Sequence, residues 1–352
     1  MKYRILITAT LMVLCATLIA RWTSQSNASV IMDDCATLEN HIKGLKAARA
    51  RLQRNLQKAT SSSDKQSLIQ QIKELDSEIK ADQNELIQRK CIGVLMRWTV
   101  SGEQREALVF ADTINTAVKH PLVFAFHWHG GSMEAAAQKM DIHTKWPEAI
   151  VVYPQGLPRA RPKESSCGNI DLAGNNPGWQ VEANQEAGDV GNKDLQFFDA
   201  MLETMRQKYN VDDQRIYATG FSNGAVFSYL LWAERGKTIA AIGEVAGRLW
   251  QSEKLKERRP ILAITGTADT TDPFTCQFAS IETAKHFDNA TASNEPCPAP
   301  DDADPDAPSP KCTLFPSTTH TPVKTYIHSG GHHYPNWAPD EIVTFFKNHK
   351  LS

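Results

Sequence analysis

Apolar residues recur every three or four positions between residues 36 and 90, the spacing of one face of an α-helix. This segment has no proline and one glycine, and the polar run 60–64 divides it while supplying an N-cap for a second helix. The pattern predicts two amphipathic helices packed as an antiparallel, coiled-coil-like hairpin. The stripe positions are Leu38, Ile42, Leu45, Leu52, Leu56 and Ala59, then Leu68, Ile72, Leu75, Ile79 and Leu86.

From Arg97 onward, short β-rich apolar runs alternate with helical patterns, which is typical of an α/β domain with a mostly parallel sheet and flanking helices. The expected strands are Leu108–Ala111, Leu122–Phe126, Ile150–Tyr153, Ile216–Thr219, Ala241–Val245, Ile261–Ile264 and Val323–Ile327. The expected helices are Lys193–Tyr209, Ala225–Glu234, Gln277–Asp288 and Asp340–Lys350.

The amino-acid composition excludes several classes of protein. The chain has 352 residues, 41% of them hydrophobic, and a formal net charge of -2. A globular composition without a basic surplus argues against disorder, a multi-span membrane protein and nucleic-acid partners.

The N-terminus resembles a secretory signal. Lys2 and Arg4 precede the apolar run Ile5–Ala20, and small residues end a polar stretch at Ala28. We predict a signal peptide over residues 1–28, the hairpin over 29–92 and a catalytic domain over 93–352, in a secreted protein. An uncleaved anchor, which alone would bring a membrane into play, is the alternative.

This division sorts the seven cysteines of the chain into two groups. Cys15 lies within the leader, and the exported part contains Cys35, Cys91, Cys167, Cys276, Cys297 and Cys312. Six cysteines in an oxidising compartment should pair, and 15 connectivities are possible. Cys35 and Cys91 are equidistant from residue 63, at the predicted tip of the hairpin, so we predict that they close its open end.

Three of the other four cysteines lie in two long loops, and the fourth, Cys276, directly precedes a predicted helix. Cys297 and Cys312 bracket the proline- and aspartate-rich loop 294–316, which indicates a local bridge, and this leaves Cys167 to pair with Cys276. The loop 155–188, which contains Cys167, is also long for a compact domain, and such loops are usually functional or tied down.

The first predicted helix is strongly basic, with six Lys or Arg residues against Glu39. One interpretation is an arm that docks an unknown partner or anchors the protein at a surface. The other is a solvated face whose charges balance those of the more acidic second helix.

Residues 220–224 read Gly-Phe-Ser-Asn-Gly, directly after a predicted strand and before a predicted helix. A sharp strand-to-helix turn of this kind exposes the serine hydroxyl, which makes Ser222 a candidate nucleophile. The nucleophile needs a base held by an acid, in the order serine, acid, histidine. Asp269 and His332 follow later strands in that order, with Asp272 and His333 as the second choices.

Acyl transfer also needs N–H donors aimed at the developing oxyanion. We expect these from the backbone of Asn223 and of Gly131, the latter in the loop after the strand Leu122–Phe126. The histidines in this loop, His127 and His129, could be combined with His332 and His333 as a zinc site, but no third ligand has a diagnostic spacing. We therefore expect no metal and no cofactor.

Together these residues resemble the extracellular polyhydroxybutyrate depolymerase and feruloyl esterase group of α/β-hydrolases, close to acetylxylan esterases. The resemblance runs from about Arg97 to the C-terminus and leaves out the hairpin. It is carried by His129-Gly130-Gly131, Asp189-Val190-Gly191, the stretch from Asp213 to Ala225, Gly266-Thr267-Ala268-Asp269 and Gly330-Gly331-His332. Thr265, Asp272 and Tyr334 depart from the group's pattern.

The resemblance implies an α/β-hydrolase fold and a serine esterase in which Ser222 is the nucleophile, His332 the base and Asp269 its orienting acid. Its substrate would be a feruloyl or acetyl ester of plant polysaccharide, or a polyhydroxyalkanoate. Trp179 is either a wall for an aromatic or sugar group or a packing residue. The alternatives are a serine peptidase on the same fold, an inactive binding module with the hairpin as docking arm, and an anchored envelope protein.

Overall fold

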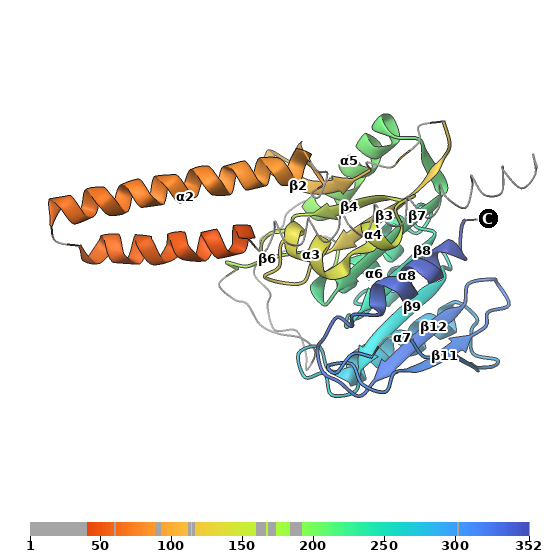
Figure 1. Ribbon diagram of the computed structural model, residues 1–352. Coiled ribbons are helices and arrows are strands. Elements are labelled where there is room, and N and C mark those ends of the chain that lie inside the picture. Colours follow the sequence, from red (N-terminus) through yellow and green to blue (C-terminus); the bar gives the residue numbers. More distant parts are fainter. Residues whose placement is uncertain are drawn as a thin grey trace, which may run out of the picture. The chain divides into compact units, whose positions relative to one another are not determined.

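The computed structural model describes residues 41–59, 61–88 (83–88 for the backbone only), 93–111, 114, 117–159, 167, 174–183, 192–300 and 303–351 (Figure 1). The chain divides into two compact units, Met1–Gly93 and Val94–Ser352. The predicted signal peptide and the Cys35–Cys91 bridge lie outside the described residues. In the part of the chain that is described, no helix combines the length and the apolar character needed to cross a membrane.

The first unit contains a helix over residues 41–58 and the helix α2 (Ser62–Gln88). The Ser61 hydroxyl accepts the Asp64 N–H at 3.2 Å, so the cap lies at the start of the expected loop and the helix begins earlier than predicted. All predicted stripe positions whose side chains are described are buried or half-buried.

Ion pairs fix the antiparallel register of these two helices. His41 lies 2.9 Å from Asp82, and Arg49 pairs with Asp76. The residue numbers therefore rise along one helix as those of the paired residues fall along the other. The Arg49–Asp76 pair neutralises part of the basic charge of the first helix within the hairpin.

The second unit is built on one ten-stranded sheet in the order β1-β2-β4-β3-β7-β8-β9-β12-β11-β10, with helices on both sides (Figure 1). The six strands from β4 to β12 in this order pair in parallel, and the strands at both edges are antiparallel. The strands are β1 (Val94–Val100), β2 (Glu103–Phe110), β3 (His120–Phe126), β4 (Ile150–Pro154), β7 (Val211–Phe221), β8 (Ala241–Val245), β9 (Ile261–Gly266), β10 (Glu295–Cys297), β11 (Lys311–Phe315) and β12 (Val323–His328). A separate two-residue pair is formed by β5 (Leu157–Pro158) and β6 (Pro177–Gly178).

Alternate residues of the central strands bury against opposite layers of helices. In β3, Leu122 and Phe124 belong to the core under α5, α6 and α7, whereas Val123 belongs to the core under α3, α4 and α8. The helices are α3 (Met133–Met140), α4 (Ile142–Lys145), α5 (Lys193–Lys208), α6 (Asn223–Arg235), α7 (Phe274–Phe287) and α8 (Ala338–Lys347), and a 3₁₀ turn covers Ser252–Lys254. The predicted α/β architecture is confirmed.

The structure contains elements that were not predicted from the sequence, chiefly β1, α3 and the antiparallel strands β10 and β11. The side chains of β1 alternate between partly buried and exposed, so this edge strand lacks the continuous apolar run of a central one. The bridges Cys167–Cys276 and Cys297–Cys312 are both present. They tie the two long loops back to the domain.

Candidate active site

Ser222 is the single residue between the end of β7 and the start of α6. Its backbone is held at φ 56° and ψ -119°, a strained conformation for a residue with a side chain. The turn is tight because a Cβ on Gly220 would lie 2.2 Å from the carbonyl carbon of Gly224, and one on Gly224 would lie 2.1 Å from the Phe126 oxygen. The two glycines of the motif are therefore required by close backbone approach.

The structure brings Ser222, His332 and Asp269 into one chain of hydrogen bonds. His332 Nε2 lies 2.9 Å from Ser222 Oγ, and His332 Nδ1 lies 2.7 Å from Asp269 Oδ2. All three residues follow the carboxyl ends of parallel strands, which meet at one edge of the sheet. This is the geometry of a nucleophile, a base and an orienting acid.

The Asp269 carboxylate accepts three hydrogen bonds besides the one from His332. Its Oδ1 accepts the N–H groups of Thr271 and Asp272 at 2.9 and 3.0 Å, and its Oδ2 accepts the Gln277 amide at 2.8 Å. Burial by itself raises the pKa of Asp269, but the hydrogen bonds and the charge interaction with His332 outweigh it and lower that pKa. Asp269 is therefore ionised at neutral pH.

The second choices for acid and base point elsewhere. The Asp272 side chain forms a buried ion pair with Arg248, and only its backbone N–H contacts Asp269. His333 lies 3.1 Å from Asp304 through Nε2, so it is turned toward the loop between β10 and β11.

Asn223 opens α6, so its N–H belongs to the first helical turn, whose N–H groups have no acceptor within the helix. Its side chain is fixed by two bonds to the Trp179 backbone: Oδ1 accepts the Trp179 N–H at 2.6 Å, and Nδ2 donates to the Trp179 carbonyl at 3.0 Å. The Asn223 N–H is thus rigidly placed next to Ser222.

Two expectations for this site need correction. The Gly131 N–H donates to the Trp128 carbonyl at 2.9 Å, so it is engaged in a turn and not free to receive an oxyanion. Trp179 is only 1% exposed, stacks on Phe227 and donates its indole N–H to the His127 carbonyl at 2.9 Å. It is a packing residue that anchors its loop, and no face of it is left for a substrate.

An open cavity of about 370 Å³ adjoins His332. It is lined by Trp128, Ala135, Gln138, Lys139, Phe221, His332, His333 and Tyr334. Phe221 stacks on the His332 ring with centroids 5.0 Å apart, and Trp128 meets Phe221 edge-on. The cavity therefore offers aromatic walls beside the imidazole and polar groups from α3.

The four histidines considered as a zinc site do not form a group of converging ligands among the described residues. Burial lowers the pKa of His127 to about 4, and both ring nitrogens are used: Nδ1 lies 2.7 Å from the Trp128 carbonyl, and Nε2 accepts the Gly156 N–H. His127 is a neutral residue that joins two loops.

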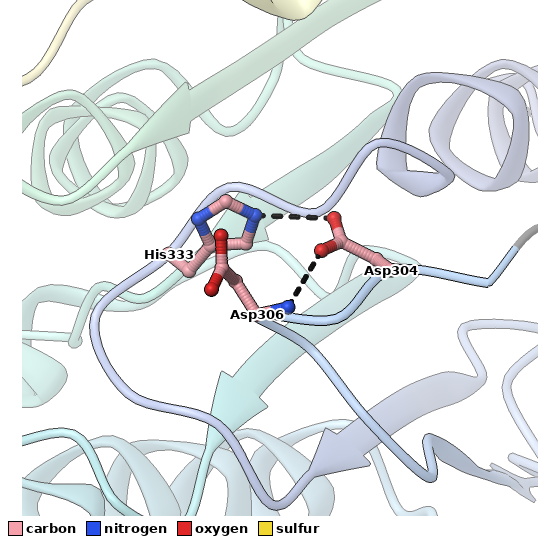
Figure 2. A group of neighbouring side chains, drawn as sticks. All are labelled: Asp304, Asp306 and His333. Carbon is pink, nitrogen blue, oxygen red and sulfur yellow. Dashed lines mark hydrogen bonds and ion pairs between the residues drawn. The ribbon is translucent and has the colours of Figure 1, made fainter.

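A different group, Asp304, Asp306 and His333, places its potential ligand atoms within 4.8 Å of one another (Figure 2). The Asp304 carboxylate is already satisfied, since it accepts the N–H groups of Asp306 and Asn336 at 2.9 and 2.7 Å. The arrangement is that of a hydrogen-bonded cluster at the base of the His332 loop.

The sheet order and the strand–serine–helix turn define an α/β-hydrolase. An acetyl xylan esterase from Aspergillus awamori superimposes with a TM-score of 0.52 at 14% identity, covering 72% of this chain and 99% of that one. No protein-family model matches the chain.

Sequence relatives agree with the resemblance to feruloyl and acetylxylan esterases. Feruloyl esterase D of Neurospora crassa is 30% identical over 159 residues, which is 44% of this chain and 49% of that protein. A bifunctional acetylxylan esterase/xylanase of Neocallimastix patriciarum is 26% identical over 175 residues, 48% of this chain and 22% of that protein. The matched region thus spans half or less of these relatives.

Gln277 and Asp304 support the site through hydrogen bonds but were not among the residues predicted from the sequence. Gln277 directly follows Cys276, which the sequence predicts to be bridged, and lies eight residues after the candidate acid; this position was the available signal. Asp304 lies in an acidic loop with no distinguishing pattern, so nothing local marked it.

Proposed function

We propose that the protein is a serine esterase that hydrolyses carboxylic esters through Ser222, His332 and Asp269. The observation that carries the proposal is the continuous hydrogen-bonded chain from Ser222 Oγ through the imidazole to Asp269, located at a nucleophile turn. Ser222 attacks the ester carbonyl while His332 Nε2 takes its proton, and Asp269 holds the imidazole in the tautomer that leaves Nε2 free to accept it.

The tetrahedral oxyanion then lies against the Asn223 N–H, a donor worth roughly 3 kcal/mol of transition-state stabilisation. His332 returns the proton to the leaving alkoxide, which leaves an acyl group on Ser222. Water activated by His332 releases the acid in the second half of the reaction.

The substrate class is proposed from the relatives and from the cavity. Feruloyl and acetylxylan esterases among the sequence relatives support esters attached to plant polysaccharide. The aromatic walls formed by Trp128 and Phe221 beside His332 favour a substrate with a ring close to the scissile bond. We therefore rank feruloyl esters above acetyl esters and polyhydroxyalkanoate.

Export through residues 1–28 is part of the same proposal. N-terminal sequencing of the exported protein should start at Ser29, and a chain that still starts at Met1 would support the uncleaved anchor. The hairpin's role as a docking arm stays a separate proposal.

The decisive variant is Ser222→Ala, which removes the nucleophile. We expect hydrolysis of p-nitrophenyl acetate to fall roughly 10⁴-fold or more and labelling by a fluorophosphonate probe to disappear. Ser228→Ala is the matched control, because this serine lies in α6, the helix that follows Ser222, and donates its hydroxyl to the Gly224 carbonyl. Retained turnover in Ser222→Ala would overturn the proposal.

Substrate panels separate the alternatives. Side-by-side ester and amide substrates distinguish an esterase from a serine peptidase on this fold, and a wild-type protein that takes no fluorophosphonate label would be an inactive binding module. Methyl ferulate, acetylated xylan and hydroxybutyrate oligomers then rank the acyl groups. Faster turnover of hydroxybutyrate oligomers than of methyl ferulate would refute our ranking.

A further inference from the structure

The loop that carries His332 is held from both sides by one segment of the chain. Before His332, the Ser329 N–H donates to the Pro308 carbonyl at 3.0 Å. After it, the Asn336 N–H donates to Asp304 Oδ2 at 2.7 Å. Both acceptors belong to residues 303–309, in the connection between β10 and β11.

Packing between the two segments is close. A Cβ on Gly330 would lie 1.9 Å from the Asp306 carbonyl oxygen, so a glycine is required where the segments meet. The Ala268 N–H donates to the Gly330 carbonyl at 3.0 Å, which ties the same glycine to the residue before Asp269. A displacement of the segment 303–309 would therefore change the positions of both His332 and Asp269.

The Asp304 side chain lies where the segment 303–309 meets the His332 loop (Figure 2). The side chain is 2% exposed and accepts from Asn336 N–H, Asp306 N–H and His333 Nε2, the last at 3.1 Å. His333 is the neighbour of His332 in sequence, so Asp304 holds the residue directly after the imidazole as well as the end of its loop. Burial alone raises the pKa of Asp304, but these hydrogen bonds lower it, so the carboxylate is charged when it accepts them.

The segment is itself anchored at its base. The bridge Cys297–Cys312 joins β10 to β11, and β11 pairs with β12, the strand that leads into the His332 loop. Because the catalytic geometry is sensitive to displacements near 1 Å, a fixed support for a flexible loop has a direct effect on turnover.

We propose that residues 303–312, which we term the brace, fix the His332 loop, and that Asp304 is the positioning residue through which the brace acts. This inference rests on the proposed function, since it assigns His332 the role of base. Asp304 touches no substrate; it sets the distance from His332 Nε2 to Ser222 Oγ.

The test compares Asp304→Ala with Asp306→Asn in the full chain. Asp306 is the matched control, because its side chain is exposed and its contribution to Asp304 is a backbone N–H that the substitution keeps. For Asp304→Ala we expect kcat on p-nitrophenyl acetate to fall roughly 10- to 100-fold with KM unchanged, and fluorophosphonate labelling to slow in parallel. Asp306→Asn should stay within about twofold of wild type in both measurements.

A second variant guards against loss of folding. Cys297→Ser with Cys312→Ser keeps the hydrogen bonds of β10, β11 and β12, so it should fold and show a smaller fall in kcat, again at constant KM. Thermal unfolding is followed for every variant, since a purely structural role would lower Tm while leaving the labelling rate of the folded fraction unchanged.

The outcomes separate this inference from the proposed function. A wild type that takes no label refutes the proposed function, whereas a labelled wild type with an equally fast Asp304→Ala refutes the brace alone. Activity that is lost on EDTA dialysis, restored by Zn²⁺ and abolished in Asp306→Asn would also overturn the brace, in favour of a cation site at Asp304, Asp306 and His333.

Discussion

Replacing Asp269 by asparagine tests the proposed mechanism at its most constrained point. Each carboxylate oxygen of Asp269 faces two donors: Oδ1 faces the Thr271 and Asp272 N–H groups, and Oδ2 faces His332 Nδ1 and the Gln277 amide. An asparagine side chain has the same shape but replaces one of these acceptors by an NH₂ group. Neither orientation of the amide can satisfy all four donors.

The size of the effect follows from the two orientations. If the amide oxygen faces the backbone N–H groups, the NH₂ group faces His332, and the imidazole must shift its proton to Nε2, where it can no longer accept one from Ser222. If the NH₂ group faces the backbone instead, two buried donors lose their acceptor at about 1–3 kcal/mol each. We therefore expect kcat to fall roughly 10³- to 10⁴-fold, or about 4–5.5 kcal/mol.

The assay is steady-state hydrolysis of p-nitrophenyl acetate by Asp269→Asn, with thermal unfolding to verify the fold. Asp272→Asn is the control, because its side chain pairs with Arg248 and only its unchanged N–H contacts Asp269. Its kcat should stay within about tenfold of wild type. Activity of Asp269→Asn within tenfold of wild type, or a larger loss in Asp272→Asn, would refute the assignment of the acid.

Three further predictions concern the fold. Gly224→Ala places a Cβ 2.1 Å from the Phe126 oxygen, so it should cost about 1–3 kcal/mol or more in chemical denaturation and abolish activity; a wild-type Tm would contradict the close approach. Burial raises the pKa of Asp288 to about 8, above its ordinary 3.8, so its contribution to stability is full at low pH and is lost as the pH rises toward 8. Between about pH 5 and 8, Asp288 should lower the free energy of unfolding of the wild type by up to roughly 1.4 kcal/mol per pH unit, and Asp288→Asn should abolish this decrease. A pH profile of denaturation unchanged from wild type would disprove the pKa shift. Non-reducing peptide mapping should recover Cys35 joined to Cys91, and either cysteine joined to another partner would show the hairpin register to be wrong.

Local patterns predicted much of the architecture because they depend on residues close together in the chain. The heptad-like stripe of the hairpin and the continuous apolar runs of β3, β4 and β9 were recognisable by period and length alone. The motif around Ser222 was equally local, since a strand, a tight turn with two glycines and a helix adjoin one another. Edge strands such as β1 were missed because their half-exposed faces carry a weaker signal.

The sequence by itself determined the candidate nucleophile, the order serine, acid, histidine, and the α/β class. The sequence ranked Asp269 ahead of Asp272 and His332 ahead of His333, but only the tertiary structure shows which side chains meet: Asp269 faces the imidazole, and His332 faces Ser222. It also showed that the Trp179 ring is buried and that the Gly131 N–H is already bonded. The physical reason is distance along the chain. His332 lies 110 residues from Ser222 and 63 from Asp269, so which of two adjacent side chains points into the site depends on how separate strands and loops pack, and short-range preferences do not encode that choice.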